Sequence, residues 1–138
     1  MMSIDEAVNL VGYAFDNADP GDLFVQKAPA AKIGDLALAM KQIFKVDNPI
    51  QTIGWRHGEK EYETLLTKEE MHGSVDLGQY FKVPADTRDL NYDQYYTEGN
   101  SEASDLEGFN SDNCRRLELD EVRTMLSKLE YVRHHLSA

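Results

Sequence analysis

Apolar residues recur at spacings of three and four in three stretches of the chain, a period that places them on one face of a helix. In the first stretch, SIDEAVNLVGYAF, Ser3 and Glu6 have the spacing of a capping box, which predicts that a helix begins after Ser3. The apolar face of the second predicted helix consists of Ile33, Leu36, Ala37, Met40, Ile43 and Phe44. A final helix is predicted from about Asp120, with an apolar face of Val122, Met125, Leu126, Leu129 and Val132.

Short runs of apolar and β-branched residues lie between these helical patterns and predict strands. DLFVQK, residues 22–27, follows a Pro-Gly turn signal, and NPIQTIGW, residues 48–55, follows the second predicted helix. The order helix, strand, helix, strand favours parallel pairing of the two strands through a crossover helix. Further along, TKEEM predicts a short helix and GQYFKV a short strand. The whole pattern predicts an α/β fold whose first helix and at least one sheet edge lack a covering layer.

Composition and charge exclude several classes of function. The 138 residues carry a net charge of −11, which argues against a surface for nucleic acid or for an anionic membrane. No apolar run approaches the roughly 18 residues of a membrane span. The start, MMSIDEAVNL, lacks a basic region before an apolar block, so we expect no secretory signal and a cytoplasmic location. The single cysteine, Cys114, forms no internal disulfide and argues against a structural zinc site.

The negative charge is concentrated in one part of the chain. Between residues 86 and 121, eleven carboxylates are opposed by three arginines. The segment PADTRDLNYDQYYTEGNSEASDLEGFNSDNC, residues 84–114, is rich in polar residues and tyrosine and shows no hydrophobic period. We therefore predict an irregular acidic arm that would need an outside surface to order it.

Common catalytic motifs are absent from the sequence. It contains no glycine-rich dinucleotide or phosphate loop, no nucleophile elbow and no tyrosine four residues before a lysine. The histidines have no metal-ligand spacing; they are His57, His72, His134 and His135. No catalytic residue and no metal ligand is therefore expected in this chain.

The strongest candidate site is GWRHGEKEYE, directly after the predicted strand 48–55. Arg56 would lie at the carboxyl end of that strand, where ligands bind in α/β folds, and Gly58 permits a sharp turn. An arginine offers a planar fork of donors to a pair of phosphate oxygens. The alternative is that Arg56, Glu59, Lys60 and Glu63 form a solvated lattice of salt bridges, each pair contributing under ~1 kcal/mol.

Four blocks of the sequence, in order, resemble one known family. They are MMSIDEAVNLVGYAF, PGDLFVQKAPAAKIGDLA, IGWRHGEKEYETLLTKEEM and YFKVPADTRDLNYDQYYTEG. Together they are similar to the carboxyl-terminal part of capsular and O-antigen polysaccharide biosynthesis enzymes. The resemblance is strongest to the UDP-N-acetylglucosamine 4,6-dehydratases that invert C5. These are extended short-chain dehydrogenases, often named UDP-glucose 4-epimerases.

The resemblance implies a two-domain parent. Its Rossmann domain would bind NADP(H) and carry a Tyr-x-x-x-Lys pair, and a smaller sugar-nucleotide domain would follow. This chain resembles only the part after the catalytic residues, so the groups that decide which carbon of which UDP-sugar reacts lie outside it. We expect a partial α/β substrate domain over residues 1–84 and a polysaccharide-biosynthesis extension over 85–138, the acidic arm plus the final helix. The complete parent would use NADP and form a homo-oligomer, whereas this chain would hold no cofactor.

The resemblance also implies roles for individual residues. Arg56 would grip the UDP pyrophosphate, with Glu59 in the same nucleotide-contacting turn and His57 as a weaker candidate. Lys27, at the end of the strand 22–27, would line the nucleotide pocket, and an exposed lysine is the alternative. The arm would pack over a neighbouring subunit or the active site, with interface contacts from Arg88, Asn91 and Tyr92.

Two hypotheses of function follow. In the first, the chain is the substrate-binding, carboxyl-terminal portion of a UDP-N-acetylglucosamine 4,6-dehydratase/5-epimerase, with lyase or isomerase chemistry, and is inactive alone. In the second, it is a non-enzymatic acidic interaction module whose tyrosine-rich arm docks on a partner protein.

Overall fold

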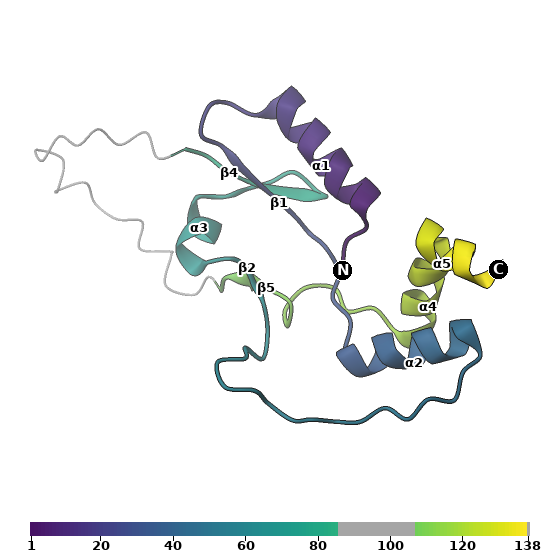
Figure 1. The fold of residues 1–138 in the computed structure, drawn as a ribbon. Coiled ribbons are helices and arrows are strands. Elements are labelled where there is room, and N and C mark those ends of the chain that lie inside the picture. Colours follow the sequence, from purple (N-terminus) through teal and green to yellow (C-terminus); the bar gives the residue numbers. More distant parts are fainter. Residues whose placement is uncertain (86–106, 138) are drawn as a thin grey trace, which may run out of the picture. The chain divides into compact units, whose positions relative to one another are not determined.

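A computed structural model of the chain describes residues 1–85 and 107–137, drawn in colour in Figure 1. It is a mixed fold of helices and short strands. The elements are α1 (Ile4–Asn17), β1 (Leu23–Gln26), α2 (Ile33–Phe44), β2 (Thr64–Leu66), α3 (Lys68–Gly73), β3 (Val75–Asp76), β4 (Tyr80–Val83), β5 (Phe109–Asn110), α4 (Leu119–Lys128) and α5 (Glu130–Leu136).

These elements form two compact units that interleave along the sequence. One unit comprises Met1–Ser3, Ala28–Glu63 and Asp112–Ala138, and the other comprises Ile4–Lys27 and Thr64–Ser111. The division of the chain at residue 84 into a substrate domain and an extension stays a prediction.

Antiparallel strands form much of the unit that comprises Ile4–Lys27 and Thr64–Ser111, which we call the sheet unit. β4 lies between β1 and β3, and residues Leu23 and Val83 are paired at one end of the β1–β4 ladder. A separate two-stranded ladder joins β2 to β5. Tyr13 of α1 packs on this unit, because its ring centroid lies 5.8 Å from that of Phe24 and 4.6 Å from that of Tyr80. The predicted parallel pairing is wrong, since the partner of β1 arrives from much later in the chain and runs in the opposite direction.

The predicted strand over residues 48–55 is also wrong. Residues 46–63, all of them described, contain neither helix nor strand. Pro49 has no N–H to donate to a ladder, and Gly54 has a φ of 73°, outside the β region. Trp55 is 68% exposed, and Ile50 and Ile53 are also exposed, so the apolar residues that suggested a strand face solvent. Arg56 therefore does not follow a strand.

The unit that comprises Met1–Ser3, Ala28–Glu63 and Asp112–Ala138, which we call the helical unit, is built on the packing of α2 against α4. Its buried core consists of Ala39, Leu117, Val122 and Leu126. A short parallel bridge joins Ala30 to Arg116, and the N–H of Leu117 donates to the Ala30 carbonyl oxygen at 2.8 Å. The predicted final helix is confirmed in position, but Leu129 adopts an extended conformation (φ −64°, ψ 130°) that divides it into α4 and α5.

Helix α1 has no buried residue, which confirms the expected uncovered apolar face. Ile4 is 83% exposed and Phe15 85% exposed, and Val8 and Val11 on the same stripe are also exposed. A contiguous apolar stripe of this kind is typical of a surface that another element covers. Within the described part of the chain, no helix is both long and apolar enough to cross a membrane.

Candidate functional site

A tight turn presents Arg56 to solvent. The backbone N–H of Arg56 donates to Glu59 Oε2 at 2.8 Å, and the N–H of Glu59 donates to the Arg56 carbonyl oxygen at 3.1 Å. Between them, Gly58 has a φ of 79°, close to the value of about 80° at the third position of a type II turn. The sharp turn expected at Gly58 is therefore confirmed, and it places Arg56, His57 and Glu59 within one reverse turn.

The Arg56 side chain is available to a ligand. Arg56 is exposed, and no carboxylate among the described residues forms an ion pair with its guanidinium. Three other arginines each pair with a carboxylate; they are Arg115, Arg116 and Arg123. Glu59 accepts the backbone N–H of Arg56 and not its guanidinium. This contact is therefore not one of the salt bridges between side chains that the alternative interpretation of the segment requires.

Lys27 belongs to the sheet unit, where its charge is already engaged. Its Nζ lies 2.5 Å from Asp76 Oδ1 and 4.2 Å from the centroid of the Phe81 ring. This hydrogen bond from Lys27, followed in importance by one from the Gly78 N–H, lowers the pKa of Asp76. Lys27 therefore ties the end of β1 to β3 and β4, and its place in a nucleotide pocket stays a prediction.

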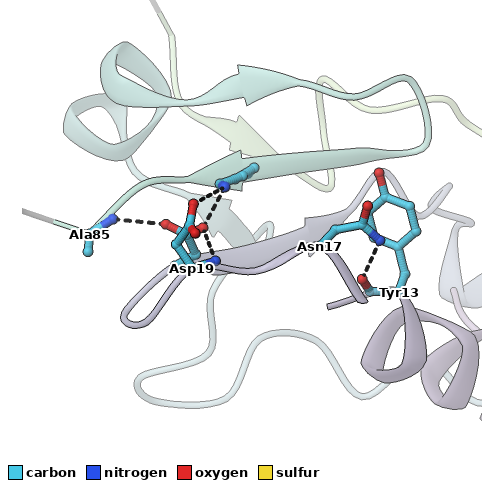
Figure 2. Close-up of polar contacts among 6 residues, drawn as sticks. Tyr13, Asn17, Asp19 and Ala85 are labelled. Carbon is cyan, nitrogen blue, oxygen red and sulfur yellow. Dashed lines mark hydrogen bonds and ion pairs between the residues drawn. The ribbon is translucent and has the colours of Figure 1, made fainter. Parts of the chain in front are cut away.

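A charged cluster that the sequence did not reveal lies beside the loop after α1 (Figure 2). Lys82 Nζ lies 2.6 Å from Asp22 Oδ2 and 3.5 Å from Asp19 Oδ2, and the Asp22 side chain is only 4% exposed. Asp22 also accepts the backbone N–H groups of Asp19 at 2.8 Å and Ala85 at 3.3 Å. The hydrogen bond from Lys82 is the main cause of the lowered pKa of Asp22. The same hydrogen bond is the main cause of the raised pKa of Lys82.

This cluster is structural. It joins the loop after α1 to the end of β4. The Ala85 N–H that it binds, drawn in Figure 2, belongs to the last residue of the described range 1–85. The only sequence signal was a turn with a carboxylate on either side of Pro20-Gly21. Its partner lies some sixty residues later, so the pairing could not be inferred from spacing.

The predicted interface residues Arg88, Asn91 and Tyr92 lie outside the described residues. The docking role of the tyrosine-rich arm, on which the interaction-module hypothesis depends, therefore stays a prediction.

Comparison with known families gives two adjacent matches. Residues 1–85 match the family described as "Polysaccharide biosynthesis protein", and residues 86–133 match the one described as "Polysaccharide biosynthesis protein C-terminal". The first match alone covers more than half of the chain.

Individual relatives agree with this assignment. Proteins named UDP-glucose 4-epimerase from Rickettsia felis and Rickettsia canadensis are each 48% identical to the chain over 136 residues. These alignments cover 99% of this chain and 40% of each relative, so the chain spans less than half the length of the curated relatives it matches. The X-ray structure of Pen from Bacillus thuringiensis superposes with a TM-score of 0.70 at 26% identity, over 91% of this chain and 35% of that one. The chain therefore belongs to the polysaccharide biosynthesis protein family, and the resemblance drawn from its sequence to the carboxyl-terminal part of these extended short-chain dehydrogenases is confirmed.

Proposed function

We propose that the chain supplies the nucleotide-sugar-binding part of an enzyme that modifies a UDP-sugar in polysaccharide biosynthesis. The observation that supports this most directly is the exposed Arg56 guanidinium, held on a defined turn and without a carboxylate partner among the described residues. Such a group donates two parallel hydrogen bonds to phosphate oxygens, which suits the diphosphate of UDP. The names of the Rickettsia relatives support a UDP-sugar as the ligand.

Within this class, we assign UDP-N-acetylglucosamine as the substrate and 4,6-dehydration with inversion at C5 as the reaction, in capsule or O-antigen synthesis. The support is the resemblance of the four sequence blocks to that group of enzymes. Epimerisation at C4 is the alternative, in line with the relatives' names. Both reactions act on the sugar and leave the UDP group unchanged, so the role of Arg56 is common to them.

The residues of this chain do not fit a dinucleotide cofactor. The sequence has neither a glycine-rich phosphate loop nor a Tyr-x-x-x-Lys pair. We therefore place NADP, the chemical step and a homo-oligomeric state in a longer protein of the relatives' length, and we assign no catalytic role to this chain. The chain alone is expected to show no turnover of UDP-N-acetylglucosamine when NADP is added.

Calorimetric titration of UDP tests the assignment of Arg56. Charge-assisted hydrogen bonds contribute about 1.5 to 3 kcal/mol each, so Arg56→Ala should weaken UDP binding by about tenfold or more. Arg56→Lys should restore only part of the loss, because lysine keeps the charge and loses the two-pronged geometry. Arg133→Ala, which removes another exposed arginine from the helical unit, should leave the affinity unchanged.

Two results would overturn the proposal. One is unchanged UDP affinity in Arg56→Ala with the circular dichroism spectrum of the unaltered chain. The other is a lack of amide shifts at the turn in the unaltered chain at about 10 mM UDP, where a site with a millimolar Kd would be largely filled.

A further inference from the structure

Helix α1 has apolar side chains on two sides, and in the part of the chain that the structure describes only one side is covered. Tyr13 faces the sheet unit, where its ring packs against those of Phe24 and Tyr80. The uncovered residues, which we call the α1 stripe, are Ile4, Val8, Val11 and Phe15. At about 100° of rotation per residue, the stripe lies on nearly the opposite side of the helix from Tyr13. The packing that holds α1 on its own unit therefore leaves the stripe facing away from that unit.

The α1 stripe is too continuous to be ordinary surface. Its four side chains are 54% to 85% exposed and follow one another along the helix at spacings of three and four residues. Single exposed apolar residues are common on protein surfaces, but a row of large ones marks a place where another surface binds. A helix with apolar residues on opposite sides is typical of a helix enclosed between two layers.

The charges of α1 argue against a second copy of this chain as the partner. The helix carries Asp5, Glu6 and Asp16 and no basic residue, and the whole chain has a net charge of −11. Two α1 helices packed stripe to stripe would bring two acidic helices together, and like charges repel each other. A second copy therefore fits the stripe less well than a neutral or basic surface does.

The longer relatives offer a different partner. The Rickettsia relatives align with 99% of this chain, yet the alignment covers only 40% of each of them. Because this chain resembles their carboxyl-terminal part, the remaining length lies before the region that corresponds to α1. Consecutive elements of a chain are usually neighbours in space, so the stripe of α1 is well placed to meet that amino-terminal part.

We propose that the α1 stripe is the docking surface for the amino-terminal part of a protein of the relatives' length. The matching surface is apolar, with neutral or basic side chains at the margin beside Asp5 and Asp16. Tyr13 holds the other side of α1 on the sheet unit, so the helix is enclosed between that unit and the amino-terminal part. The inference does not depend on the ligand of Arg56, and none of its tests uses UDP.

Cysteine labelling measures whether the stripe is covered. Phe15→Cys and the control Asn9→Cys are made in a Cys114→Ser background, because Asn9 is also exposed on α1 but lies outside the stripe. Each variant is prepared in this chain alone and in a longer protein, in which the preceding part of the Rickettsia felis relative is joined to this chain. Reaction with iodoacetamide is followed by mass spectrometry of the α1 peptide.

The thiol of Phe15→Cys should react about tenfold or more slowly in the longer protein, whereas that of Asn9→Cys should react at similar rates in both proteins. Equal rates for Phe15→Cys in the two proteins would overturn the proposal. Slowing of Asn9→Cys by the same factor would show general shielding of the helix, and the stripe would then be wrong as the docking face.

The dependence on protein concentration separates the two possible occupants. Protection of Phe15→Cys by a part of the same polypeptide should be constant over about a hundredfold range of concentration. Protection in the longer protein that rises with concentration would assign the stripe to a second copy, and the proposal would be wrong.

Urea unfolding tests the energetic role of the stripe. Phe15→Glu should lower the urea midpoint of the longer protein by roughly 0.5 M or more, because it places a charge without a partner in an apolar contact. It should leave the midpoint of this chain alone unchanged at low concentration, because Phe15 is 85% exposed there. Asn9→Glu adds the same charge outside the stripe and should change neither midpoint. Equal effects of Phe15→Glu on the two proteins, or no effect on either, would overturn the proposal.

Discussion

Gly21 should tolerate a methyl group poorly, and the structure indicates by how much. Its φ is 90°, and a Cβ built at this position would lie 2.8 Å from the Cβ of Ala85. A left-handed backbone costs a residue with a side chain about 1 to 2 kcal/mol, and forcing an extra methyl into a packed contact costs about 1 to 3 kcal/mol. Alanine also lowers the conformational entropy of the unfolded chain, which offsets about 0.4 to 1 kcal/mol of this cost. Gly21→Ala should therefore lower the free energy of unfolding by about 1 to 5 kcal/mol.

Gly12 supplies a matched control in the same unit. It lies inside α1, and nothing is within 4 Å of the position that its Cβ would occupy. Gly12→Ala should stabilise the chain by about 0.5 to 1 kcal/mol, because alanine is the better helix former. The same substitution is thus expected to have opposite signs at two positions nine residues apart.

Urea unfolding followed by far-ultraviolet circular dichroism measures both changes. Combining Gly21→Ala with Ala85→Gly removes the contact and keeps the backbone strain, so it should recover the part of the loss that is due to packing. A Gly21→Ala variant within about 0.5 kcal/mol of the unaltered chain would refute the close approach of the two segments.

Three further results are expected. The pKa of Asp22 is lowered, so its contribution to stability is present above the unfolded pKa of 3.8 and is lost as pH falls through the lower folded pKa. The pKa of Lys82 is raised, so its contribution is lost only as pH rises above the unfolded pKa of 10.5. The thermal midpoint should fall in acid below about pH 4, and it should fall less steeply in Asp22→Asn; equal slopes would contradict the pairing. Thr67→Ala removes the capping oxygen that accepts the Glu70 N–H, and it should lower the free energy of unfolding by about 1 kcal/mol in the same urea assay. An unchanged free energy of unfolding would mean that α3 does not depend on its cap. The chain should self-associate through the exposed stripe of α1, and Phe15→Glu should shift it toward the monomer in sedimentation velocity; an unchanged distribution would assign self-association to another surface.

The helices could be predicted because their signals are local. The spacing of apolar residues located α1, α2 and α4, and the pairing of Thr67 with Glu70 located α3 together with its capping box. The prediction of a strand over residues 48–55 is wrong because apolar and β-branched content alone does not specify a ladder, and Pro49 and Gly54 disfavour one. The pairing of β1 with β4 depends on contacts between residues far apart in the sequence, which no local pattern specifies.

The candidate site was predictable to the same extent. The succession of Arg56, Gly58 and Glu59 indicated an exposed charged turn, and the turn is present. The partner of Glu59 was not predictable, because a glutamate beside an arginine suggests an ion pair between side chains. The structure pairs it with the backbone instead.

The interleaving of the two units has a consequence for the gene. Residues 107–137 supply β5, which pairs with β2 beside buried Leu66, and they also supply α4, which covers buried Ala39 of α2. A nonsense codon or frameshift just beyond Val83 would remove both elements and expose the buried residues Leu66 and Ala39, one in each unit, in a single event. Large-to-small changes in a core cost about 2 to 5 kcal/mol each, and the loss of a whole packed element costs more. Residues 107–137 are therefore needed by both units, and alleles truncated between residues 83 and 107 should lower the amount of protein through degradation of the product.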